Sequence, residues 1–139
     1  MKVAIVFEST RGRTKAMADA ICEGATSAGV ECVVFDAKEF PGFDDLCGIA
    51  VGSSTRMKRT LPMVKRILSE LPPLNGLPSA GFGSYGWSGE APDEIATRLK
   101  EAGGNLVDEN PIKAKDYPSD SILDQCRALG QRLAEKCGN

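Results

Sequence analysis

Five short apolar segments alternate along this 139-residue chain with stretches that repeat apolar residues at helical spacing. Strands that alternate with helices are typical of a parallel sheet covered by helices on both faces. The central segments also lack the polar alternation of a strand with one wet face. The pattern predicts an α/β fold, a three-layer αβα sandwich around a five-stranded parallel sheet of strand order 2-1-3-4-5. The expected strands are residues 3–7, 32–35, 49–52, 80–83 and a weaker one within 105–113.

Four helices are expected between and after these strands. The first covers about residues 15–28 and ends at Gly29, because glycine is common just after a helix. The second has Pro62 in its first turn, where the missing N–H does no harm. The last two begin near Ala91 and shortly before Ile122. The apolar stripes of all four helices are assigned to the core.

Length and composition indicate one domain, residues 1–139, with a single core. The content of 42% hydrophobic and 26% charged residues is ordinary for a globular protein, and no apolar run is long enough to span a membrane. Met1 and Lys2 lead directly into a strand and leave no room for a signal peptide, so we expect a cytoplasmic protein. The net charge of −2 gives no reason to expect nucleic-acid binding.

The chain has five cysteines and no histidine. The missing histidine excludes a Ser-His-Asp triad, a Cys-His nucleophile and histidine zinc sites, so demanding chemistry would need a cofactor. The cysteines are odd in number and form no C-x-x-C pair, so no disulfide framework is expected. We expect all five to be free thiols that pack as small hydrophobic residues. They are Cys22, Cys32, Cys47, Cys126 and Cys137.

The segment after the first strand has the composition of a phosphate-binding turn. It reads Ser-Thr-Arg-Gly-Arg-Thr over residues 9–14 and leads directly into a helix. The N–H groups and dipole of a helix N-terminus favour an anion. The hydroxyls of Ser9, Thr10 and Thr14 add donors, and Gly12 allows a close approach or a positive φ. A helix cap without any ligand is the alternative that this motif leaves open.

Two further loops are expected at the same edge of the sheet, where ligands bind to doubly wound folds. Residues 52–62 form a polar segment longer than a simple connection needs. Residues 83–90 are rich in glycine and contain Tyr85 and the only tryptophan, Trp87. Aromatic side chains in a loop favour a flat ligand, and a Trp87 folded back onto the core is the alternative.

These loops resemble those of the flavodoxin family, and most closely the flavodoxin-like domain of flavodiiron proteins, here as a stand-alone domain. The resemblance covers nearly the whole chain. It rests on Ser9-x-x-Gly12-x-Thr14, on residues 52–55 with Leu61-Pro62, and on residues 82–89. It implies a flavodoxin-like fold with FMN bound non-covalently.

The resemblance also implies which residues bind FMN. The first loop would hold the phosphate, and the other two would flank the isoalloxazine ring, with either Tyr85 or Trp87 making the closer contact. No catalytic or metal-binding residue is implied. The cofactor-binding positions are Ser9, Thr10, Arg11, Gly12, Arg13 and Thr14; Ser53, Ser54, Thr55, Arg56 and Met57; and Gly83, Ser84, Tyr85, Gly86, Trp87 and Gly89.

Two positions depart from the family pattern. Arg13 stands where asparagine is usual and brings an extra cation toward the phosphate. The second loop commonly contains Asn-Gly, whereas residues 56–59 contain no glycine. In related proteins a peptide here rotates so that its carbonyl oxygen accepts a hydrogen bond from the N5–H of the one-electron-reduced flavin. Without glycine a positive φ costs about 1–2 kcal/mol, so we expect only weak stabilisation of that redox state.

The cations of the second loop, Arg56, Lys58 and Arg59, have two possible roles. They would favour the anionic, fully reduced flavin and so raise its second reduction potential, or they would dock an acidic redox partner. The sequence leaves both open.

The leading hypothesis is an electron-transfer protein that serves protein redox partners, as a monomer or weak dimer, rather than an enzyme. The alternative is an FMN-dependent NAD(P)H:quinone-type oxidoreductase whose basic loop holds nicotinamide phosphates. A phosphoacceptor receiver is excluded because Gly52-Ser53 stands where its aspartate is needed. A small phosphatase is excluded because no cysteine heads a Cys-x5-Arg loop after a strand. Without histidine the chain cannot bind iron as a complete flavodiiron protein does.

Overall fold

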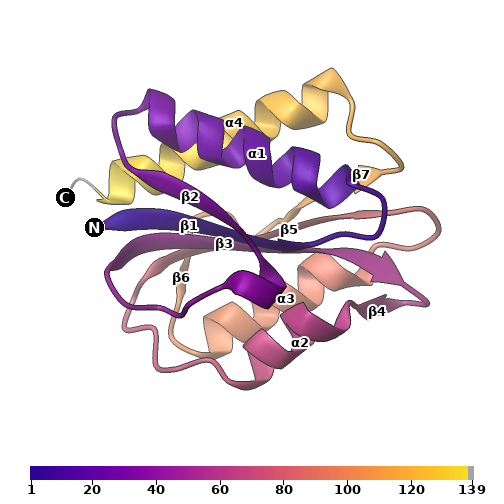
Figure 1. The fold of residues 1–139 in the computed structure, drawn as a ribbon, viewed down its shortest axis with the longest axis horizontal. Helices are drawn as coiled ribbons and strands as arrows, with labels where there is room; N and C mark the ends of the chain where they lie inside the picture. The colour runs from indigo at the N-terminus through magenta and orange to yellow at the C-terminus, as the bar shows by residue number, and fades with distance from the viewer. Residues whose placement is uncertain (138–139) are drawn as a thin grey trace.

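The structure is a computed structural model that describes residues 1–137, and it consists of one sheet between two pairs of helices (Figure 1). The first half of the chain forms β1 (Lys2–Glu8), α1 (Arg13–Ser27), β2 (Cys32–Asp36), the 3₁₀ helix η1 (Ala37–Glu39), β3 (Leu46–Arg56) and β4 (Arg59–Thr60). The second half forms α2 (Pro62–Ser69), β5 (Pro78–Tyr85), α3 (Glu90–Glu101), β6 (Asn105–Leu106), β7 (Ile112–Lys115) and α4 (Asp120–Cys137).

The strand order confirms the predicted 2-1-3-4-5 topology. The sheet runs β2-β1-β3-β5-β6 with parallel pairing, and β7 also pairs with β5. The structure has seven strands rather than five for two reasons. The expected last strand is divided because residues 107–111 carry polar groups and Pro111, which cannot donate to the ladder. In addition, β4 turns back against the end of β3 as an antiparallel hairpin.

Helices cover both faces of the sheet, as a doubly wound fold requires. Figure 1 shows α1 and α4 on one face and α2 and α3 on the other. Successive side chains of β1 point to opposite faces. Val3 and Ile5 therefore pack in the core beneath α1 and α4, while Ala4 and Val6 pack in the core beneath α2 and α3. Of the helices that the structure describes, none combines the length and the hydropathy that crossing a membrane requires.

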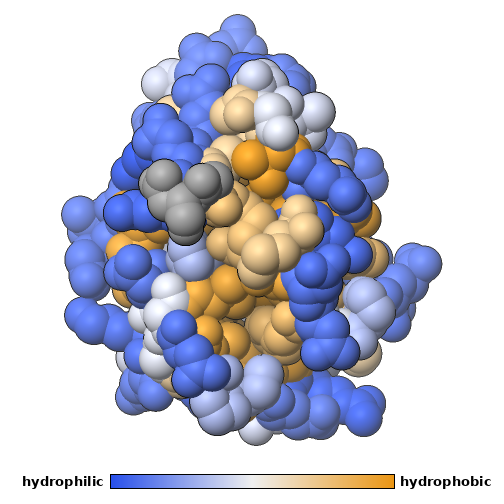
Figure 2. All heavy atoms as spheres, turned by 90° about the vertical axis from the view of Figure 1, so that its left-hand side faces the viewer, coloured by the Kyte–Doolittle hydropathy of each residue, from blue (hydrophilic) through white to orange (hydrophobic). Residues whose placement is uncertain are grey.

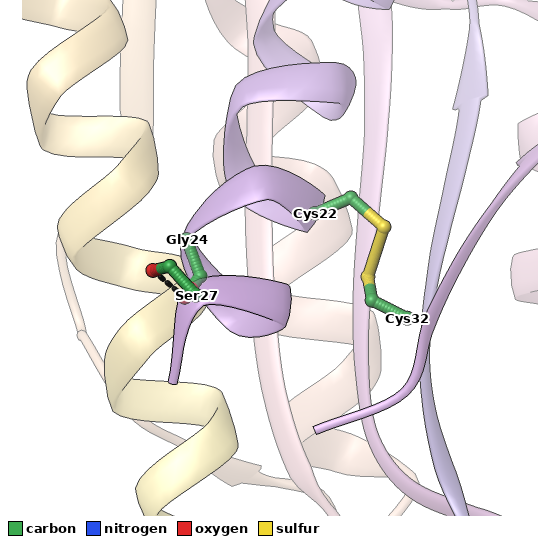
Figure 3. The surroundings of a disulfide bond; sticks show 4 residues. All are labelled: Cys22, Gly24, Ser27 and Cys32. Carbon is green, nitrogen blue, oxygen red and sulfur yellow. Dashed lines mark hydrogen bonds between the residues drawn. A yellow bond between two sulfur atoms is a disulfide. The ribbon is translucent and has the colours of Figure 1, made fainter. Parts of the chain in front are cut away.

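Four of the five cysteines form disulfides, so the expectation of five free thiols was wrong. Cys22 of α1 is bonded to Cys32 of β2 (Figure 3), and Cys47 of β3 is bonded to Cys137 at the end of α4. The Cα atoms are 5.6 Å and 5.0 Å apart, within the range that a disulfide needs. The spacing in the chain gives no sign of either pair, because the partners lie 10 and 90 residues apart and meet only in the folded sheet.

The second disulfide lies at the end of the molecule that carries both termini. Figure 2 shows apolar surface gathered in the middle of this end and ringed by hydrophilic residues. A hollow of about 340 Å³ there is lined by Met1, Leu46, Cys47, Leu77 and Cys137, among others. Because Cys47 lies in β3 and Cys137 ends α4, the disulfide between them fixes the end of the last helix against the central strand.

Cys126 is the one free thiol within residues 1–137, and we expect it to be inert in the folded protein. Burial raises its pKa to about 12, although neighbouring Arg127 acts in the opposite direction. Only the thiolate reacts, and a shift from 9 to 12 lowers its fraction about a thousandfold at pH 8. Cys126 and Arg132 have Cys-x5-Arg spacing, but both lie within α4 and form no loop after a strand.

A thiol titration tests this assignment. In the folded protein at pH 8 a thiol reagent should find no fast-reacting group. In denaturant without reductant it should find one thiol per chain, and five after reduction. Rapid modification of the folded protein, or five thiols before reduction, would contradict the assignment.

Candidate FMN site

Three loops meet at the end of the sheet opposite the two termini (Figure 1). They follow β1, β3 and β5, which are neighbours in the sheet, so parallel pairing brings their carboxyl ends together. This is the edge at which the strand order reverses, as the sequence predicted. A fourth loop, after β7, joins them.

The first loop forms an open helix N-terminus. Gly12 has φ 80° and precedes α1, and its N–H donates to the Ser9 hydroxyl at 2.9 Å. The first backbone bond of the helix runs from the Ala16 N–H to the Gly12 carbonyl oxygen at 3.0 Å. By helix geometry the N–H groups of residues 13–15 therefore have no partner within the helix. No side chain caps this terminus, so the alternative of a simple capped helix does not describe it.

A buried hydroxyl cluster joins the first loop to the other two. The Thr14 hydroxyl lies 2.7 Å from that of Ser84 and 3.1 Å from that of Ser54. Ser53 accepts from the Leu61 N–H at 3.0 Å and donates to the Ser54 carbonyl oxygen at 2.7 Å. All four hydroxyl residues are buried. They hold α1, β3 and β5 together beneath the loops.

The second loop is a hairpin whose two central residues are left-handed. Met57 has φ 51° and Lys58 has φ 64°, between the paired residues Arg56 and Arg59. Positive φ at both centres is the geometry of a type I′ turn, which suits the twist of a hairpin and usually contains Asn-Gly. A positive φ costs free energy in residues other than glycine, and Met57 and Lys58 both adopt it here.

Replacing Met57 and Lys58 by Asn-Gly should stabilise the FMN-free protein by about 1–2 kcal/mol, because the left-handed conformation is then unstrained. Lys38→Gly is the matched control: Lys38 is exposed in η1 and has no positive φ, so this change should be destabilising. Urea unfolding measures both. A loss of stability in the Asn-Gly variant would contradict the turn geometry.

The third loop faces the hairpin across a cleft. Trp87 is 91% exposed, so the alternative of a tryptophan folded back onto the core is wrong. Trp87 and Ser88 line one side of a cleft of about 350 Å³, and Thr55, Met57 and Lys58 line the other. Met57 and Trp87 are both strongly exposed and line the same cleft, and adjoining apolar side chains on a surface mark a ligand or interaction site.

The side of this cleft that contains Thr55 is fixed to α3. The Thr55 hydroxyl accepts from the Ala91 N–H at 3.1 Å, at the start of that helix. Glu90, directly before Ala91, has one carboxylate oxygen that is buried and lacks a hydrogen-bond partner. Gly83 is required on the strand that leads to this loop, because a Cβ atom there would overlap the Ser53 carbonyl oxygen.

Asp116, in the fourth loop, was not predicted. Its N–H donates to the Tyr85 carbonyl oxygen at 2.7 Å, and its carboxylate lies 3.6 Å from the Arg13 guanidinium. A Cβ atom on Gly86 would lie within 4.0 Å of both members of this ion pair. The charge of Arg13 is therefore partly balanced by Asp116. The position of Asp116 directly after the last strand was the sequence signal that could have identified it as a site residue.

Glu8, at the end of β1, is a second residue that sequence reasoning missed. Its carboxylate oxygen accepts from the N–H groups of Met63 and Val64 at 2.8 Å and 2.9 Å. It thereby caps the N-terminus of α2, where a negative charge is favoured. This contact fixes the segment that follows the hairpin.

An αβα sandwich whose loops enclose a cleft at the reversal of strand order defines a flavodoxin-like protein. Residues 5–130 match the family model described as flavodoxin, and the chain belongs to the flavodoxin family.

Known proteins agree with this assignment. The structure of a flavodoxin from the domain Archaea is 37% identical, with a TM-score of 0.93 over the whole of both chains. The flavodiiron protein from Giardia intestinalis is 28% identical, with a TM-score of 0.91, over 98% of this chain and 36% of that one. The anaerobic nitric oxide reductase flavorubredoxin of Aeromonas hydrophila is 34% identical over 97% of this chain. The chain spans less than a third of that relative's length.

The family establishes the cofactor as FMN and the general role as redox chemistry. The residues of this site fit that cofactor. The open N-terminus of α1 suits a phosphate, and exposed Arg11 lies in the same loop. The cleft between Met57 and Trp87 presents apolar walls to a flat ring.

Proposed function

We propose that this protein carries electrons on non-covalently bound FMN between protein redox partners. The observation that carries this proposal is the cleft between Met57 and Trp87, which lies at the same edge of the sheet as the open N-terminus of α1. A carrier must hold FMN and leave its edge accessible, and it needs no general acid or base. A chain without histidine suits that role.

The site residues divide into two layers in this proposal. The N–H groups of the first turn of α1, with Ser9, Thr10, Arg11 and Arg13, bind the phosphate. Thr14, Ser53, Ser54 and Ser84 support these loops from below. The residues that line the ring are Thr55, Arg56 and Met57 on one side and Tyr85, Gly86, Trp87 and Gly89 on the other.

Fluorescence tests the position of the ring. Trp87 is the only tryptophan, so its emission reports a single place in the molecule. Titration with FMN should quench this emission in parallel with loss of free-flavin fluorescence, at micromolar FMN. Binding that leaves the Trp87 emission unchanged would place the ring elsewhere, and no binding at all would refute the carrier function.

A second candidate function is an NAD(P)H:quinone-type oxidoreductase. The exposed cations Arg56, Lys58 and Arg59 beside the cleft favour it, because they suit the phosphates of a nicotinamide nucleotide. Steady-state oxidation of NADH or NADPH by the FMN-loaded protein with a quinone distinguishes the two. Turnover above that of free FMN would support the enzyme.

We also propose a monomer or weak dimer located in the cytoplasm. Cytosolic thiols are usually kept reduced, although intracellular proteins of hyperthermophiles are an exception. Cell fractionation combined with thiol trapping in the intact cell tests the location and the state of both disulfides together.

A further inference from the structure

The tip of the β3–β4 hairpin carries unpaired positive charge. Arg56, Lys58 and Arg59 are exposed, and none of them takes part in an ion pair with another described residue. Of the other basic residues at this end, Arg13 is paired with Asp116 and Lys113 with Asp93. Arg11 and Lys115 are exposed and, like the hairpin cations, form no ion pair with another described residue. The hairpin cations therefore contribute little to the stability of the fold and leave their charge directed to solvent.

Exposed apolar side chains lie at the same end. Four large hydrophobic residues are strongly exposed in the part of the chain that the structure describes, and three of them follow the carboxyl ends of strands. These three are Met57, Trp87 and Tyr117, exposed by 85%, 91% and 65%. Met57 and Trp87 line the cleft assigned to the ring, and Tyr117 lies outside that cleft. Methionine, aromatic residues and arginine at the edge of such a cleft are also typical of a protein interface.

The charge of the molecule is unevenly distributed. The chain as a whole carries −2, so unpaired cations at this end leave an excess of carboxylates elsewhere. A cluster of unpaired, exposed cations is attracted by the field of a negatively charged partner before contact, and such steering raises association rates.

We propose that the hairpin tip formed by Arg56, Lys58 and Arg59 docks a one-electron redox protein whose contact surface is acidic. This inference rests on the proposed carrier function and adds the chemistry of the partner. In each encounter one electron passes from reduced FMN to the metal centre of the partner. Two encounters return the FMN to its oxidised form and release its proton to solvent.

Two haem proteins of opposite surface charge test this proposal. Cytochrome b5 has an acidic surface around its haem, whereas that of cytochrome c is basic. The FMN-loaded protein is fully reduced and mixed with either ferric cytochrome, and haem reduction is followed by stopped flow at several salt concentrations. The variant is Arg59→Gln, because Lys58 lines the cleft and Arg56 is assigned to the ring. The matched control is Lys136→Gln, which removes the same charge near the two termini.

With cytochrome b5, the rate of the unaltered protein should fall as salt rises, because salt screens attraction. The hairpin variant should be about twofold slower at low salt and show a weaker salt dependence, because one of the three cations is removed. The control variant should behave like the unaltered protein. With cytochrome c, the hairpin variant should be no slower than the unaltered protein.

The outcomes separate the two levels of the proposal. All variants are compared at equal flavin absorbance, and failure of the unaltered protein to take up FMN would refute the carrier function itself. If FMN binds but the cytochrome b5 rate is the same in the hairpin variant, the docking proposal is wrong. It is equally wrong if both cytochromes are slowed to the same degree, because the cations would then act on the flavin rather than on the partner.

Discussion

Removing the disulfide between Cys47 and Cys137 is expected to lower the free energy of unfolding by about 4–5 kcal/mol, the larger of the two disulfide effects. The bond closes a loop of 90 residues, so it restricts the unfolded chain strongly. The bond between Cys22 and Cys32 spans only 10 residues, and its loss should lower stability by about 3 kcal/mol. Urea unfolding of the two double Cys→Ala variants measures both effects.

Reductant provides the control for this comparison. It should destabilise the unaltered protein and have no effect on a variant that lacks all four bonded cysteines, because Cys126 is the only thiol left. An unfolding midpoint of the unaltered protein that does not change with reductant would show that these disulfides do not stabilise the folded chain.

Alanine at Gly24 or Gly130 is expected to destabilise the protein by about 2–3 kcal/mol or more, although alanine normally stabilises a helix relative to glycine. The reason is the close contact between α1 and α4. A Cβ atom on Gly24 would overlap the Arg127 carbonyl oxygen, and one on Gly130 would overlap the Ile21 carbonyl oxygen. Either methyl group must push the two backbones apart.

Gly48→Ala is the matched control for these variants. A Cβ atom there would meet its nearest neighbour, a methyl group of Val3, at 3.5 Å, which is ordinary contact. Gly48→Ala should therefore lower the free energy of unfolding far less, as measured by urea unfolding. The double variant Gly24→Ala/Gly130→Ala should also cost less than the sum of the single changes, because the first separation makes room for the second methyl group. Stabilisation by either single change would contradict this packing.

The elements that sequence reasoning located correctly are those with a strong local pattern. The apolar runs over residues 3–7 and 80–83 lie within β1 and β5, and Gly29, with φ 90°, follows the end of α1 as predicted. The weaker run within 105–113 was expected to be one strand and is two. Its polar centre leaves the sheet and the apolar residues on either side return to it.

The features that were missed depend on contacts between distant parts of the chain. Cys22 and Cys32 meet only because α1 packs over the sheet beside β2, and the odd number of cysteines argued against pairing. The contacts of the Thr14 hydroxyl with Ser54 and Ser84, on two other strands, were not predicted from the motif. Met57 and Lys58 adopt a left-handed turn that their residue types disfavour, because the hairpin fixes it.

The most direct test of the central claim is a stepwise reduction of the FMN-loaded protein, followed by its visible spectrum. We expect the protein to acquire flavin absorbance on mixing with FMN and to keep it through gel filtration. That absorbance should be lost on adding two electrons per FMN and should recover fully on reoxidation. A protein that emerges from the column without flavin would contradict the proposed role as an FMN-based electron carrier.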